Sequence, residues 1–199
     1  MIAPPLETCP SMREAEIKIA LTHHLAAGIP DTAFHFLEEL ELNGGEIRAD
    51  LVHTMDMHCY EIKSETDSLS RLVGQGSRYA RVFDQVTLVT AERHLKKAMQ
   101  MLPPWWGVMI VPNDASREFR HVRTAKINKR HEPDVLMTLL KREEALKILA
   151  DLGVTRGFKS KSLYIIQAKV AELLSLEELK ERVRHCLIER AKTPSSIAP

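Results

Sequence analysis

The stretch between Glu46 and Tyr79 constrains the fold most, because two strand patterns are followed there by a helical pattern. Residues 47–55 and 58–64 are predicted to be strands joined by a tight turn near Met55 and Asp56. From Asp67 onward, apolar residues recur at helical spacing as far as about residue 83. We therefore expect a β-hairpin that leads directly into a helix.

Polar residues occupy matching positions in this predicted hairpin. Residues at equal distances from a hairpin tip lie opposite each other, so Asp50 is expected to face Glu61. Lys63 follows Glu61 by two residues and therefore points to the same face of its strand. Gln75 and Tyr79 are four residues apart and share one face of the helix. The five side chains are predicted to meet in one region.

Two carboxylates and a lysine suit metal-dependent hydrolysis of phosphodiesters. Mg²⁺ prefers oxygen ligands, so Asp50, Glu61 and the carbonyl of Ile62 are predicted to bind Mg²⁺ or Mn²⁺. Lys63 is expected to hold the attacking water and to stabilise charge on the phosphate. The alternative is a solvated strand face with a weak surface ion pair. The apolar neighbours of Asp50 favour the catalytic interpretation, because a buried charge needs a partner.

An Asp followed by Glu-x-Lys on such a hairpin resembles the PD-(D/E)XK nuclease superfamily, although Ala49 replaces the proline of that name. Gln75-x-x-x-Tyr79 resembles the helix motif of its RecB-like branch. The segments RADLV, YEIKS, FDQVTLVT and PPWWGVMIV extend the resemblance to a little-characterised bacterial and phage subfamily. The resemblance implies a restriction-endonuclease-like core and metal-dependent nuclease activity. It also implies that Gln75 orients the attacking water or Lys63, and that Tyr79 approaches the DNA backbone.

The rest of the chain predicts an α/β fold, in which a central mixed sheet is flanked by helices and followed by a helical C-terminal part. Residues 34–42 are predicted to be a strand, with a short helix as the alternative, and Asn43-Gly44-Gly45 is a hairpin turn. The other expected helices cover residues 11–27, 92–102, 134–152, 160–174 and 176–191, and the other strands cover 85–91, 105–111 and 118–125. We expect a nuclease-like core over residues 1–130 and a helical region over residues 131–199.

A glutamate of the first helix is a further candidate for the site. Glu14 shares a face with Ile17 and Leu21 and is expected to point toward the sheet. Glu14 could instead only cap the helix as the partner of Ser11, and Glu16 is the other candidate.

Charge is distributed unevenly along a chain whose net charge is +1. Residues 1–67 carry 13 acidic and 4 basic residues, and the remainder carries 14 acidic and 24 basic ones. This asymmetry fits a metal site beside a phosphate-binding surface, or else ordinary surface variation. Candidate nucleic-acid contacts are Arg48, Arg71, Arg78, Arg120, Arg123 and Lys126. The last three could equally belong to a basic exposed linker.

Three cysteines without metal-ligand spacing indicate neither a disulfide framework nor a zinc site. The absence of a signal peptide or a long apolar run predicts a cytoplasmic protein without a membrane partner. Trp105 and Trp106 are expected to anchor a strand, with stacking on unpaired bases as the alternative. The C-terminal helices are candidates for a structural role, a lid, a homodimer interface or a DNA-binding accessory.

The sequence thus predicts a nuclease that depends on Mg²⁺ or Mn²⁺ and cleaves DNA, with RNA as the alternative substrate. Two other functions stay open. One is a non-catalytic nucleic-acid-binding or interaction protein that retains the nuclease fold. The other is a transcription regulator that acts through the C-terminal helices.

Overall fold

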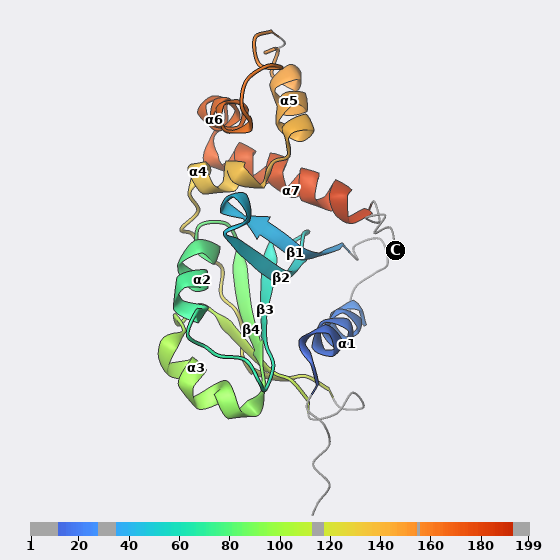
Figure 1. Ribbon diagram of the computed structural model, residues 1–199, viewed down its shortest axis with the longest axis vertical. Helices are drawn as coiled ribbons and strands as arrows, with labels where there is room; N and C mark the ends of the chain where they lie inside the picture. The colour runs from blue at the N-terminus through green and yellow to red at the C-terminus, as the bar shows by residue number, and fades with distance from the viewer. Residues whose placement is uncertain (1–11, 28–34, 113–117, 155, 193–199) are drawn as a thin grey trace, which may run out of the picture.

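A six-stranded mixed sheet forms the centre of the protein (Figure 1), as a computed structural model of residues 12–27, 35–112, 118–154 and 156–192 shows. The strand order is β1-β2-β3-β4-β5-β6. β3 pairs in parallel with β4, and β4 with β5, whereas the other pairs are antiparallel. The strands are β1 (Phe36–Leu42), β2 (Ile47–His53), β3 (His58–Lys63), β4 (Gln85–Thr90), β5 (Gly107–Ile110) and β6 (Arg120–Arg123). The predicted α/β class with a central mixed sheet is confirmed.

Helices cover both faces of this sheet (Figure 1). α1 (Glu14–Ala26) packs through Ile17 and Leu21 on one face, together with the buried residues Tyr60 and Ile62 of β3. The other face carries α2 (Leu72–Tyr79), η3 (Glu92–His94) and α3 (Leu95–Met101). Because successive side chains of a strand alternate between faces, β3 directs Tyr60 and Ile62 to α1 and Cys59 and Glu61 to α2.

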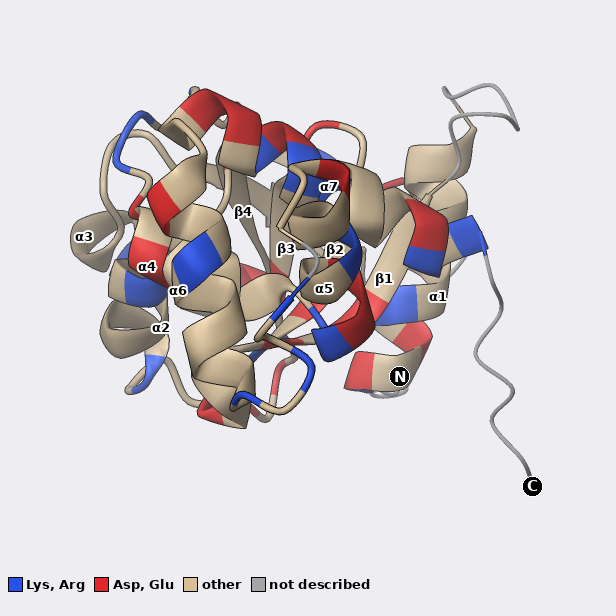
Figure 2. Ribbon diagram, turned by 90° about the horizontal axis from the view of Figure 1, so that it is seen from above, with Lys and Arg blue, Asp and Glu red and all other residues tan. Residues whose placement is uncertain are grey.

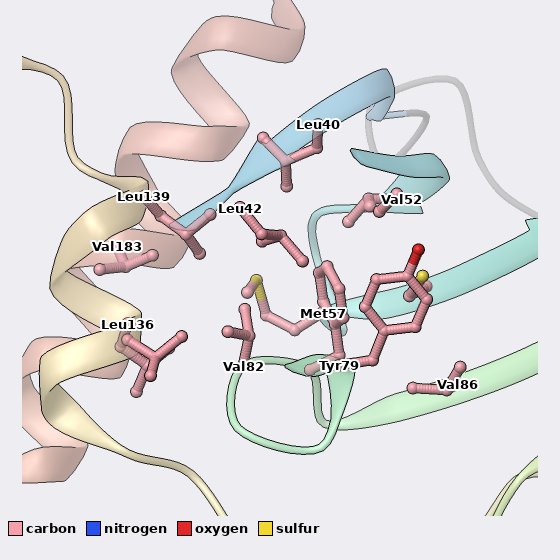
Figure 3. Close-up of a cluster of buried hydrophobic side chains, with 14 of the residues drawn as sticks. Leu40, Leu42, Val52, Met57, Tyr79, Val82, Val86, Leu136, Leu139 and Val183 are labelled. Carbon is pink, nitrogen blue, oxygen red and sulfur yellow. The ribbon is translucent and has the colours of Figure 1, made fainter. Parts of the chain in front are cut away.

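The C-terminal helices share the core of the α2 face. In Figure 3, Leu40 and Leu42 of β1 lie toward Leu136, Leu139 and Val183, and all five belong to one buried cluster. The helices concerned are α4 (Pro133–Leu136), η4 (Met137–Leu139), α5 (Arg142–Asp151), α6 (Leu163–Leu173) and α7 (Leu176–Lys192). Acidic and basic residues are interspersed over α5 and α7 (Figure 2). Among the described residues, no helix is long and apolar enough to cross a membrane.

Two predicted helices differ from the structure. The motif helix begins at Leu72, because Asp67 accepts hydrogen bonds from the N–H and the hydroxyl of Ser64 and holds the preceding residues in a turn. The predicted helix over residues 134–152 is interrupted at Leu140, which is extended and whose carbonyl accepts a hydrogen bond from Gln167 (2.8 Å). A new helix then starts at Arg142, because Glu144 accepts the N–H of Lys141 (2.6 Å).

Capping at the first helix also differs from the expectation. Ser11 lies outside the described residues, and the N-cap is Arg13, whose N–H donates to the carboxylate of Glu16 (2.7 Å). Glu16 is therefore the capping residue, and Glu14 is left free of that role. At the start of α7 the predicted pair is confirmed, since Ser175 donates to Glu178 through its N–H (2.9 Å) and its hydroxyl (2.7 Å).

Candidate active site

The β2–β3 hairpin places Asp50 opposite Glu61, as the sequence predicts. The antiparallel ladder pairs Leu51 with Tyr60, and the same register, continued by one residue, sets Asp50 against Glu61. The ladder itself ends at Leu51, and beyond it Asp50 Oδ2 accepts a hydrogen bond from the N–H of Ile62 (2.7 Å). Since a strand residue directs its N–H and its C=O to the same side, the Ile62 carbonyl also faces β2.

The alternation of side chains between the two faces of β2 is interrupted at Asp50. Leu51 belongs to the core under α1, whereas Val52 and Ala49 both belong to the core under α2. On β1, Glu39 occupies the position across from Asp50 and has a positive φ of 51°. This conformation is uncommon for residues other than glycine. The irregularity directs polar side chains to a place where a regular strand would present an apolar one.

Glu61 lies fully buried beneath the site and is held from two sides. Its Oε2 accepts a hydrogen bond from the Tyr79 hydroxyl (2.6 Å), and its Oε1 pairs with the ammonium of Lys63. Burial alone would lower the pKa of Lys63, but Glu61 and Asp50 raise it above its ordinary value. Lys63 is therefore charged at neutral pH.

Tyr79 does not approach nucleic acid as the resemblance implies. It is completely buried, stacks on Trp106 at 6.2 Å between ring centroids, and orients Glu61. The expectation of a contact with the DNA backbone is wrong, because the ring of Tyr79 packs inside the core under α2. The alternative of helix packing is correct.

A cleft of about 510 Å³ opens above these residues. Asp50, Lys63 and Gln75 line it, as do the predicted Glu14 on α1 and Arg48 on β2. Gln75 lies on α2, and its Oε1 is buried with no hydrogen-bond partner among the described residues. The structure thus brings together the residues that the sequence predicts from four separate elements.

Carboxylates crowd this cleft. One oxygen each of Glu14, Glu39 and Asp50 can lie within 4.8 Å of the others. Burial and the neighbouring Glu61 raise the pKa of Asp50 to about 7, and the hydrogen bond from Ile62 opposes that rise. The metal-free cleft therefore retains a proton on Asp50 under conditions in which an ordinary aspartate is ionised.

The sequence analysis missed Glu39, which lines this cleft, and Lys18, which pairs with Glu39. Glu39 could have been found by the counting that pairs Asp50 with Glu61, because the turn after Leu42 sets position 39 opposite position 50. Lys18 is one helical turn after Glu14 and donates to Glu39 (2.5 Å) with its side chain only 11% exposed. The sequence signal for Lys18 was a lysine next to the apolar face of the helix, where a charged side chain needs a partner.

The predicted basic contacts divide into two groups. Arg48 and Arg71 line the cleft, and Arg78 lies 3.8 Å from Glu46, another lining residue. Arg120 pairs with Glu92, and Arg123 donates to the carbonyls of Trp106 (2.6 Å) and Pro103 (3.1 Å). These two belong to β6, which β4 and β5 separate from β3, and Lys126 follows β6. The structure does not bring Arg120, Arg123 and Lys126 to the cleft.

The donor set of the cleft fits a hard divalent cation. Asp50, Glu14, Glu39 and the Ile62 carbonyl offer only oxygen, which Mg²⁺ and Mn²⁺ prefer. In the described part of the chain, Lys18 and the exposed Arg48 pair with Glu39, and Lys63 pairs with Glu61. Burial and repulsion from Glu61 raise the pKa of Asp50, and a bound cation would relieve the repulsion.

Comparison with known proteins gives one family. The family model described as bacteriophage P4 protein cII matches residues 9–197. Protein cII of Enterobacteria phage P4 is 28% identical over 174 residues, which cover 86% of this chain and 65% of that protein. A solved structure of the SPO1766 protein of unknown function from Silicibacter pomeroyi is 19% identical, with a TM-score of 0.41, and covers 79% of this chain and all of that one.

Proposed function

The chain belongs to the bacteriophage P4 protein cII family, and we propose that it is a nuclease that depends on Mg²⁺ or Mn²⁺ and cleaves DNA. The observation that carries the proposal is the convergence of Asp50, Lys63 and Gln75 in one cleft directly above the buried Glu61. This constellation also supports membership of the PD-(D/E)XK superfamily, which we likewise propose.

Each residue of the cleft has a distinct task in this proposal. Asp50, Glu61 and the Ile62 carbonyl would hold the cation, with Glu14 and Glu39 beside them, and the bound cation would polarise the scissile phosphate. Lys63 donates to a phosphate oxygen as a compact charge. Gln75 Oε1, which lacks a partner among the described residues, accepts a hydrogen bond from the attacking water.

The surrounding residues position this machinery. Tyr79 fixes the carboxylate of Glu61 from within the core, so that Lys63 is the remaining mobile partner of Glu61. Arg48 and Arg71 line the cleft as cationic side chains and contact the phosphates on either side of the bond that breaks.

Cleavage of labelled single-stranded and duplex DNA and RNA in Mn²⁺ tests the proposal. We expect the unmodified protein to cut at least one of these substrates and Lys63→Ala to leave it intact. Lys97→Ala is the matched control, because this lysine of α3 is exposed and does not line the cleft. If no substrate is cut that Lys63→Ala spares, the nuclease proposal is wrong.

A non-catalytic nucleic-acid-binding role is the second candidate, and the comparisons favour it over hydrolysis. The name of protein cII states no enzymatic activity, and the chain spans only 65% of the length of that relative. In addition, both oxygens of Glu61 already have partners in Tyr79 and Lys63. A carboxylate whose oxygens are both paired within the protein also fits a purely structural role. Calorimetry with Mn²⁺ separates the two: heat of binding that Asp50→Ala abolishes supports the nuclease, and no heat from either protein supports the second candidate.

A further inference from the structure

A second hollow lies against the same helix as the cleft but has the opposite character. This apolar groove, of about 600 Å³, is lined by residues 101–106, by residues 127–130, and by Leu72, Val73, Gly76, Ser77 and Ala80 of α2 and its C-terminal end. Its volume is in the usual range for small-ligand pockets. Val73 and Ile127 are exposed at its rim by 61% and 62%. Large apolar side chains exposed together in this way mark a binding surface.

A hydrogen-bond donor without a partner is buried in the wall of the apolar groove. Trp106 is 0% exposed, and its Nε1 has no hydrogen-bond partner among the described residues. A Cβ added to Gly76, which lines the groove too, would lie 3.0 Å from Cζ2 of Trp106, 3.6 Å from Cη2 and 3.8 Å from Cε2. The benzene edge of Trp106 therefore packs against Gly76, and the buried ring supports the groove wall there.

Trp105 presents a second aromatic ring to the apolar groove. It is half-buried and stands edge-to-face against Trp106, with 6.0 Å between ring centroids and 68° between planes. Its carbonyl accepts a hydrogen bond from the N–H of Lys126 (2.8 Å), and the carbonyl of Trp106 accepts one from Arg123 (2.6 Å). These hydrogen bonds hold the backbone of both residues, and the contact between the rings holds Trp105 against the buried Trp106, which favours a flat ligand that stacks.

The charge around the apolar groove is of one sign. Lys129 and Arg130 are exposed and line the groove, and no acidic residue of the described part of the chain lines it. A ligand that combines a flat ring and negative charge complements these features. A nucleotide has both, because its base stacks while its phosphate binds lysine and arginine.

We propose that the apolar groove binds an unpaired nucleotide of a nucleic-acid strand. The base stacks against Trp105, and the adjoining phosphate contacts Lys129 and Arg130. The inference rests on the proposed function only in taking nucleic acid as the ligand, and it requires no hydrolysis. Because α2 separates the apolar groove from the cleft, a substrate that occupies both must have a single-stranded part.

The two tryptophans of the chain are adjacent and both line this groove, so tryptophan fluorescence reports on it locally. The experiment titrates oligothymidylate into the metal-free full chain. We expect quenching of the fluorescence and, for Ile127→Glu, an affinity about tenfold or more lower, because the new carboxylate repels phosphate and blocks stacking. Ile19→Glu is the matched control, since Ile19 of α1 is 61% exposed and lies outside the groove. It should bind as the unmodified protein does.

Three results would overturn the inference: binding without quenching, equal affinities of Ile127→Glu and Ile19→Glu, or quenching that rises with protein concentration before any oligonucleotide is added. The last result would identify the groove as an interface between two copies of the chain. The proposed function is tested separately. Binding and quenching without cleavage in Mn²⁺ would support the groove and contradict the nuclease, whereas cleavage by a protein whose fluorescence ignores oligothymidylate would do the reverse.

Discussion

Asp50 and Asp84 are both partly buried aspartates near a lysine, yet their surroundings oppose each other. Asp84, just before β4, lies 2.9 Å from Nε2 of His131 and 3.0 Å from the ammonium of Lys180 on α7. Burial would raise the pKa of Asp84, but His131 and Lys180 lower it below its ordinary value. At Asp50, burial and Glu61 raise the pKa to about 7.

The contrast separates a completed ion cluster from an incomplete one. Asp84 ties the core to α7 and is already matched by groups of the chain itself. Asp50 shares its cleft with Glu14 and Glu39, lies above the buried Glu61, and has a charge that is not matched in the same way. The first arrangement stabilises the fold, and the second favours a bound cation.

The largest expected difference concerns hydrolysis by variants of the two lysines. Lys63→Ala should lower kcat by about 10² to 10³, the usual cost of removing one donor that stabilises transition-state charge. Lys180→Ala should leave kcat unchanged for the folded protein, because this lysine contacts Asp84 rather than the cleft. Initial rates in Mn²⁺, corrected for the folded fraction, measure both. A loss of equal size in Lys180→Ala would remove the distinction between the two clusters.

Stability should change in opposite directions when either aspartate becomes asparagine. Asp84→Asn should destabilise the fold by about 2 kcal/mol, because it leaves His131 and Lys180 without a carboxylate. Asp50→Asn should stabilise the metal-free fold at pH 8 by about 2 kcal/mol, since it removes a charge that the fold holds at a cost.

Chemical denaturation of both variants with a chelator present gives these free energies of unfolding. The contrast fails if Asp50→Asn is also destabilised.

The two aspartates should also differ in how they respond to pH. The raised pKa of Asp50 contributes stability that is full below about pH 4 and is lost as pH rises through about 7. The lowered pKa of Asp84 contributes stability that is full above its ordinary pKa and is lost as pH falls through the lower folded value.

A cation must displace the proton of Asp50 to bind. The affinity for Mn²⁺ should therefore rise about tenfold per pH unit up to about pH 7 and then level off. Calorimetry in buffers of different ionisation enthalpy checks the expected release of one proton. An affinity independent of pH between 5 and 7 would contradict a role for Asp50 as a ligand.

The smallest effect is expected at Tyr79. Tyr79→Phe keeps the ring against Trp106 but removes the donor to Glu61, so the fold should lose about 1 kcal/mol and hydrolysis should fall severalfold. Thermal unfolding and initial rates measure the two changes. Unaltered hydrolysis would show that Lys63 alone is enough to orient Glu61.

The central hairpin was predictable because its information is local. Counting from the turn near Asp56 places Asp50 opposite Glu61, and alternation puts Lys63 on the face of Glu61. The strand at Phe36–Leu42 was also predicted, although its sequence allowed a helix. The predicted start of α2 was wrong, because the carboxylate of Asp67 accepts the N–H of Ser64 and holds this segment in a turn ahead of the helix.

Other features depend on contacts between distant segments. Tyr79 is buried partly by Trp106, which directly precedes β5. The sequence of α2 alone does not predict this contact. Which tryptophan is buried and which is half-buried depends likewise on how residues 103–106 meet Gly76. The position of Glu39 opposite Asp50 could be predicted by the counting that pairs Asp50 with Glu61, but the positive φ of Glu39 could not.

The hydrogen bond from the N–H of Ile62 to Asp50 makes the backbone of β3 sensitive to what occupies the cleft. Where a regular ladder would offer a backbone carbonyl, this amide meets a carboxylate that can exchange a proton or a cation. The electron density at that acceptor changes with its occupant, and the amide proton resonance of Ile62 moves with it. One backbone nucleus near the C-terminal end of β3 thereby registers the state of the site without any reporter group being attached.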